Sequence, residues 1–170
     1  SYDHSNTINL FALGALLAWL REDLSFDGWP VEGPRIAAPD VTLPKLADEA
    51  DVAPGTWQRV LRLNTLGDTA RPIILASMYR HLAHAPDFLE QVEAVLTPVA
   101  HDGTLRDIIV ANRAGAYERA RVLGRAIAAP RPGPEIRGAI EPAVAAFLDH
   151  AIGKMVTICR GIRAARGPLA

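Results

Sequence analysis

Apolar residues recur along most of the chain at the three- and four-residue spacing of amphipathic helices. The pattern is dense from Ile8 to Leu20, returns from Trp57 to Leu63, and continues through 88–96 and 105–127. No segment alternates apolar and polar residues with the period of two that is typical of a strand. The sequence therefore predicts an all-α fold, a single-domain bundle of about six to eight helices without a sheet.

Proline and glycine mark where the predicted helices begin and end. Proline suits the first turn of a helix, so Pro54, Pro72 and Pro86 each predict a helix start, whereas a residue before proline avoids the α conformation. Residues 1–170 then divide into a helix over 8–24 capped within Ser5–Thr7, a Pro/Gly-rich connection over 27–44, a short helix over 43–50, a helical core over 54–128, and a long C-terminal helix over 134–163.

The first predicted helix is apolar on nearly every face, which indicates burial in a core or a subunit interface. Gly14 and Ala15 would let another backbone come close. The stretch is too short to span a bilayer and lacks the basic start and cleavage site of a signal peptide, so we expect a cytoplasmic protein that does not enter a membrane. The first and last helices are the candidate interfaces of an expected homodimer.

Charge adds little to this picture. The chain holds 18 basic and 19 acidic residues, for a net charge of −1. Such a balance produces no strong field to attract nucleic acid, and we expect none to bind. The one basic cluster, Arg160, Arg163 and Arg166, lies where a final helix ends, and we interpret it as complementing the helix dipole.

The sequence offers no recognisable cofactor or metal motif. A single cysteine, Cys159, excludes an intrachain disulfide and a Cys-rich zinc site, and its apolar surroundings favour a core or interface position. His81 and His84 could share a helix face, but no further ligand motif accompanies them. Glycine-rich nucleotide-binding loops are absent from the sequence. We expect neither a metal nor a cofactor.

Polar residues on otherwise apolar helix faces are the best candidates for a binding site. Buried polar groups need partners, and a set that faces one cavity could bind a small polar ligand, with an arginine as the partner of a carboxylate. An internal hydrogen-bond network with Arg113 at the surface is the structural alternative. The predicted pocket residues, on two helices, are Ser77, Met78, Tyr79 and His81, and Asn112 and Arg113, with Tyr117 nearby.

One stretch resembles a known family. Tyr79 is followed by the run Arg80–Ala83, then by Pro86 and the pair Phe88–Leu89. This order resembles the repeat hallmark of the group I 2-haloacid dehalogenases of the DehI type. Val95–Pro98 is similar to the end of that family's following helix, and Gly103–Arg106 is similar to the turn of the wider AhpD-like helical superfamily. The resemblance covers residues 56–127.

The resemblance implies two similar helical halves around a buried pocket, in which an aspartate activates the water that displaces halide from a small 2-haloacid. In this chain Met78 stands at the acidic position, between Ser77 and Tyr79. A thioether cannot act as a general base. The AhpD branch needs a CxxC pair, which is absent after Asp107.

Three functions follow as hypotheses. The chain could be a hydrolase of small 2-halo or related carboxylic acids that uses another carboxylate, with Asp107 or Asp68 as candidates and Arg113 holding the substrate. It could be a non-catalytic relative that binds a small carboxylic acid. It could also be a helical interaction module. The missing aspartate favours the second and third hypotheses over the first.

Overall fold

The protein is all-α over the part of the chain that the structure, a computed structural model, describes: residues 2–22, 24, 42, 44–67, 74–127 and 129–165. These residues contain no strand, and the predicted all-α bundle is confirmed. The elements are α1 (Tyr2–Arg21), the 3₁₀ turn η1 (Glu49–Asp51), α2 (Pro54–Thr65), α3 (Ser77–Leu82), α4 (Pro86–His101), α5 (Thr104–Gly124), α6 (Pro134–Phe147), the π-helical turn η2 (Leu148–Ile152) and α7 (Gly153–Ala165).

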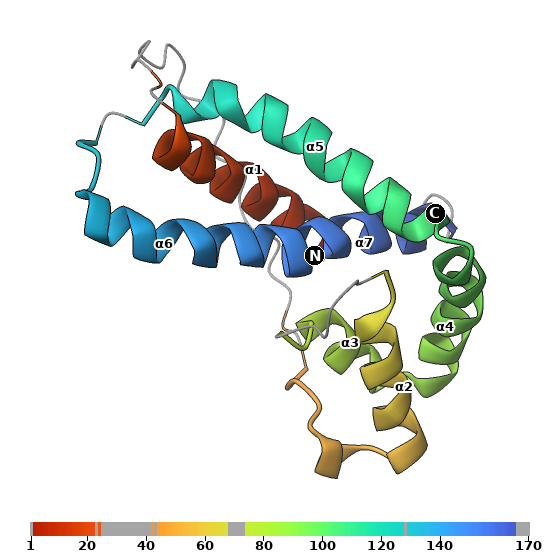
Figure 1. Ribbon diagram of the computed structural model, residues 1–170. Helices are drawn as coiled ribbons and strands as arrows, with labels where there is room; N and C mark the ends of the chain where they lie inside the picture. The colour runs from red at the N-terminus through yellow and green to blue at the C-terminus, as the bar shows by residue number, and fades with distance from the viewer. Residues whose placement is uncertain are drawn as a thin grey trace.

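The helices form two groups (Figure 1). In the first, α1 lies between α5 and the rod made by α6, η2 and α7. In the second, α2, α3 and α4 pack beneath the end of the first group, and α4 leads directly into α5. Each group has its own cluster of buried apolar residues, and α7 contributes to both: Ile158 to the lower cluster and Val156 to the upper one.

Small residues bring α1 and α5 into close contact. A Cβ added to Gly14 would lie 2.9 Å from the Ala120 Cβ, and one added to Gly124 would lie 3.0 Å from the Ala15 carbonyl oxygen. Ala18 and Ala120 are fully buried at this contact. The close backbone approach predicted at Gly14 and Ala15 is therefore confirmed, and it occurs within the chain.

The first helix begins earlier than predicted, at Tyr2 rather than near Ile8. The expected capping residues Ser5–Thr7 lie inside it, and the Thr7 hydroxyl donates to the Asp3 carbonyl, four residues back, at 2.7 Å. This bond to the previous turn is one that a helical threonine readily makes. Leu17, a candidate interface residue, is only 4% exposed within the protomer.

Long-range hydrogen bonds overrule two predicted helix boundaries. The helix expected from Pro72 begins only at Ser77. The Asn64 side chain donates to the Ile74 carbonyl and accepts from the Ala76 N–H, both at 3.0 Å, which holds residues 74–76 outside the helix.

The short helix expected over 43–50 is the other correction. Residues 44–48 are not helical, and only η1 follows them. Their carbonyls bind side chains of α3 and of the turn that follows it: Arg80 donates to Ala47 at 2.8 Å, and ring nitrogens of His81 and His84 lie 2.7 and 2.8 Å from the carbonyls of Pro44 and Lys45. These side-chain bonds compete with the helical bonds of the segment and give its carbonyls other partners.

The C-terminal rod follows the predicted range but contains a π turn. The Gly153 N–H donates to the Leu148 carbonyl, five residues back, where an α-helix would use four. No residue of α6 is buried, and Ile136, Ile140 and Phe147 are exposed. Pro134–Ala164 is long and apolar enough to cross a membrane by length and composition alone, a test that the core helix of a soluble protein also passes.

Some predictions lie outside the described residues. They are those on most of the 27–44 connection, on Asp68, on Pro72 and on Arg166.

Candidate functional site

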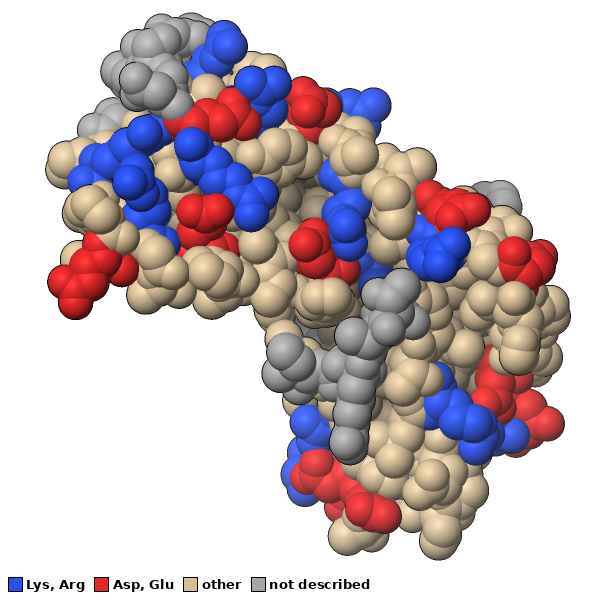
Figure 2. All heavy atoms as spheres, viewed as in Figure 1, with Lys and Arg blue, Asp and Glu red and all other residues tan. Residues whose placement is uncertain are grey.

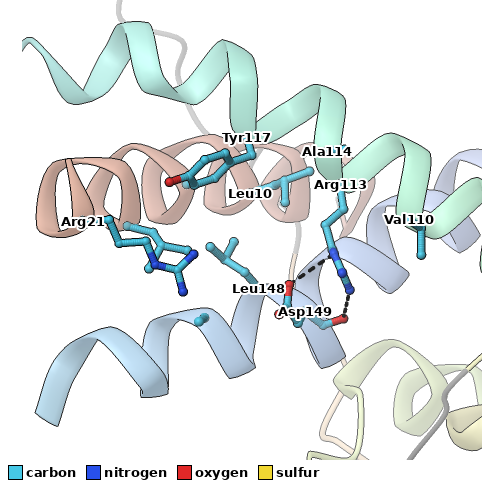
Figure 3. A pocket seen from close by; sticks show the side chains of 11 residues that line it. Leu10, Arg21, Val110, Arg113, Ala114, Tyr117, Leu148 and Asp149 are labelled. Carbon is cyan, nitrogen blue, oxygen red and sulfur yellow. Dashed lines mark hydrogen bonds and ion pairs between the residues drawn. The ribbon is translucent and has the colours of Figure 1, made fainter. Parts of the chain in front are cut away.

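A cavity of about 240 Å³ lies in the upper group, between α1, α5 and the junction of α6 with η2 (Figure 3). Most of its wall is apolar and formed by small or aliphatic side chains. Three charged side chains and one tyrosine interrupt that wall. The lining residues are Leu10, Gly14, Leu17, Arg21, Val110, Arg113, Ala114, Tyr117, Ala145, Leu148 and Asp149.

Arg113 reaches across the cavity from α5 to the π turn (Figure 3). Its Nε lies 3.1 Å from Asp149 Oδ1, and its Nη1 donates to the Asp149 carbonyl oxygen, also at 3.1 Å. The side-chain stem passes over Gly153, where an added Cβ would lie 2.8 Å from Arg113 Cδ. The glycine therefore makes room for the arginine, and Asp149 fixes the orientation of its guanidinium group.

The opposite end of the cavity is formed by Arg21 and Tyr117. Arg21 Nε donates to Glu141 Oε1 at 2.8 Å, which ties α1 to α6. The Tyr117 hydroxyl donates to Glu22 Oε1 at 3.3 Å. Burial, and then the charge of Glu22, raise the pKa of Tyr117. Its hydroxyl therefore stays protonated at neutral pH and remains a hydrogen-bond donor.

The cavity thus combines an apolar body with cationic donors. A guanidinium group has five N–H donors, and the described contacts of Arg113 use two of them. Among the described residues, the lining includes two arginines and one acid, Asp149. Such a site suits a small ligand with an apolar body and an anionic head, because arginine binds carboxylates through paired N–H donors.

The structure separates the two groups of predicted pocket residues. Met78 and Tyr79 belong to the lower apolar core, with exposed fractions of 6% and 0%. Ser77 is exposed at the start of α3. Both ring nitrogens of His81 have partners, Nδ1 the Tyr2 hydroxyl and Nε2 the Pro44 carbonyl. None of these four residues lines the cavity beside Arg113.

The second group is itself divided between two faces of α5. Arg113 lines the cavity described above, whereas Asn112 lines an apolar groove beside α4 and donates to the Thr157 hydroxyl at 3.1 Å. The candidate base Asp107 is an exposed residue whose carboxylate lies 3.7 Å from Arg106 Nε. Ile109 on the same helix is buried, whereas Ile108 is 46% exposed.

Asp149 and Arg21 are site residues that the sequence reasoning missed. Asp149 interrupts the apolar stripe of the last helix directly after Phe147–Leu148, which was the available signal. Arg21 stands in the last turn of α1, where arginine is common for electrostatic reasons alone. Their shared cavity depends on the packing of three helices, which local sequence does not reveal.

Cys159 occupies a core position, as predicted. Its thiol lies 3.2 Å from the Met78 sulfur and 3.7 Å from Asn6 Nδ2, at the meeting of α1, α3 and α7. Burial raises the pKa of the Cys159 thiol to about 11. A thiol with so little thiolate at neutral pH is a poor nucleophile. Among the described residues, no group of His, Cys, Asp and Glu side chains is placed to hold a metal ion.

Figure 2 shows basic and acidic side chains interspersed over one face of the molecule, with no large area of a single sign. Many of these charges are paired across helices: Glu93 of α4 binds both Arg59 and Arg62 of α2, at 2.7 and 2.8 Å. No family model, curated protein or solved structure matches the chain. The resemblance to the dehalogenases therefore stays a hypothesis.

Proposed function

We propose that the protein binds a small carboxylic acid with an apolar body in the cavity between α1, α5 and η2, without catalysing its conversion. The observation that supports this proposal is the placement of Arg113. Its methylene groups pack over Gly153, and Asp149 orients its guanidinium group. The described contacts leave N–H donors of this guanidinium group for a ligand. A preoriented guanidinium group binds a carboxylate with little loss of side-chain entropy.

The apolar wall limits the size of the ligand. A cavity of about 240 Å³ lies below the usual range of drug-sized pockets, so a short aliphatic acid fits better than a large one. Leu10 and Leu148 would contact its hydrocarbon part, while Arg113 would approach its carboxylate.

Calorimetric titration with propionate, butyrate and 2-chloropropionate tests the proposal. Arg113→Gln should weaken binding by about tenfold, because a hydrogen bond between charged groups is worth about 1.5–3 kcal/mol and this site is partly exposed. Arg106→Gln is the control, since Arg106 is an exposed arginine of the same helix outside the cavity.

Filling the cavity provides a second test with its own control. Ala111 and Ala114 are both exposed alanines of α5, but only Ala114 lines the cavity. Ala114→Leu should abolish binding, and Ala111→Leu should leave it unchanged. Equal affinities in the two variants would refute the assignment of this cavity.

An active hydrolase is the second candidate, because the cavity contains one carboxylate, that of Asp149. Halide release from 2-chloropropionate separates the two functions. We expect none from the wild-type protein, since one Asp149 oxygen is engaged by Arg113 at 3.1 Å. Turnover by the wild type that is lost in Asp149→Asn would instead establish a hydrolase with Asp149 as its base.

A further inference from the structure

A second, larger cavity lies on the other side of α5, between α4 and α7. It is a groove of about 670 Å³ whose wall is mostly apolar. Each of the three helices contributes apolar side chains, among them Val92, Val95 and Leu96 from α4, Ile108 from α5, and Ile158 and Ile162 from α7. Its volume lies within the range of about 300–1,000 Å³ that is typical of ligand pockets.

Two features of the groove favour the binding of an apolar ligand. Val95 and Ile108 on its walls are 61% and 46% exposed, and grouped exposed apolar residues usually mark a binding surface. Gly161 of α7 lines the groove, and an added Cβ there would meet no atom within 4 Å. The missing side chain at this position leaves open space along the groove.

Arg160 brings positive charge to the wall of the groove. Arg160, which lines it, and Arg163 both bind the carboxylate of Asp3, at 3.3 and 3.0 Å. Two guanidinium groups thus share one carboxylate in the described contacts. None of the described lining residues is acidic, and the polar ones besides Arg160 are uncharged. The wall therefore combines a large apolar surface with one cation, Arg160, whose charge Asp3 neutralises only in part because Arg163 binds the same carboxylate.

We propose that this groove binds a single long aliphatic chain that ends in a carboxylate, a ligand of the fatty-acid class. The chain lies along the apolar wall between α4, α5 and α7, which removes apolar surface of both partners from water. The ligand carboxylate lies at Arg160. It joins the Asp3 carboxylate there, so that Arg160 and Arg163 have two anionic partners between them. The proposal is independent of the cavity at Arg113, which is smaller and lies on another face of α5.

Calorimetric titration with dodecanoate, dodecanol and dodecyltrimethylammonium, each below its micelle concentration, tests the chain and the head group separately. Dodecanoate should bind best and the ammonium compound worst. Arg160→Gln should weaken dodecanoate binding by roughly fivefold, the size expected for a partly exposed ion pair, and leave dodecanol binding unchanged. Equal affinity for all three probes would overturn the assignment of the head group to Arg160.

A pair of glycine variants tests the place of binding. Gly161→Leu fills the groove, whereas Gly138→Leu adds the same side chain to α6, where a Cβ also meets nothing within 4 Å. Both replacements favour the helix, so both variants should fold, which circular dichroism checks. Dodecanoate affinity should fall by roughly tenfold or more in Gly161→Leu alone. Unchanged dodecanoate affinity in Gly161→Leu would refute the proposal. Self-association of the wild type that Gly161→Leu abolishes would also refute it, because a second copy of the chain would then occupy the groove.

Discussion

Replacing Gly153 by alanine should destabilise the protein, although alanine is the better helix former. A Cβ at this position would lie 2.8 Å from Arg113 Cδ and 2.9 Å from the Leu148 carbonyl oxygen. Carbon atoms pack best at about 3.5–4.0 Å. The arginine stem can move aside, but the Leu148 oxygen is backbone and accepts the Gly153 N–H within the π turn. Relief of both contacts therefore requires the turn itself to shift.

The size of the effect follows from two opposing contributions. Overpacking of this kind costs about 1–3 kcal/mol. The change from glycine to alanine within a helix returns up to about 1 kcal/mol. Gly161→Ala, in the same helix, gains the second contribution without the first, because its Cβ meets no atom within 4 Å. We expect the free energies of unfolding of the two variants to differ by about 2 kcal/mol in favour of Gly161→Ala.

Urea unfolding followed by circular dichroism measures both free energies, and thermal unfolding should separate the variants by about 4–8 °C for a chain of this size. Titration with a short carboxylic acid adds a functional readout, since displacement of Arg113 should weaken binding in Gly153→Ala alone. If Gly153→Ala were as stable as Gly161→Ala, the packing argument for Arg113 and the π turn would be wrong.

Other expected outcomes concern single side chains. Cys159 should react with an aromatic disulfide reagent only on unfolding, because burial raises its pKa to about 11; rapid labelling of the native protein would contradict this. Glu93→Gln should lower stability by about 1 kcal/mol at neutral pH. Hydrogen bonds from Arg62 and then Arg59 lower the pKa of Glu93 from 4.5. The stability that the Glu93 carboxylate contributes is therefore present above pH 4.5 and is lost as the pH falls through the lowered pKa. A stability difference between wild type and Glu93→Gln that persists in acid would refute this reasoning. Met78→Asp should unfold the protein rather than confer halide release, because Met78 is 6% exposed in the core. Leu17→Asp should unfold the protomer, because Leu17 is buried, and it therefore cannot test the predicted homodimer. Ile140→Asp changes an exposed residue of α6 instead, and sedimentation should show that it weakens the dimer.

The sequence predicted helix boundaries correctly where a residue at the boundary itself determines it. Pro54, Pro86 and Pro134 each stand at a helix start, because the fixed proline backbone suits the first turn. The start of α3 at Ser77 was not predictable in this way. It is set by Asn64, whose side chain binds Ala76, twelve residues further along the chain and directly before the helix.

The candidate site depended even more on tertiary structure. Arg113 was identified from its place on an apolar helix, but its partner Asp149 lies 36 residues away. Sequence reasoning combined Ser77, Tyr79 and Arg113 into one pocket because each is polar on an apolar face. The packing places Tyr79 in the lower core and Arg113 in the upper group, so similar local patterns serve different parts of the molecule.

The π turn at η2 changes how the C-terminal rod relates to its neighbours. A π turn is equivalent to one extra residue in an α-helix, which shifts the angular phase of everything after it by about 100°. The rod is therefore two helices of different phase on one axis: α7 directs residues such as Met155 and Ile158 into the lower core, while α6 has no buried residue. Deletion of a single residue within 148–152 would bring the two phases together and rotate α6 relative to α1, whereas the ends of the rod would hardly move. Insertions and deletions at this turn would thus change which residues of α6 face α1, while the residues of α7 would keep their places in the lower core.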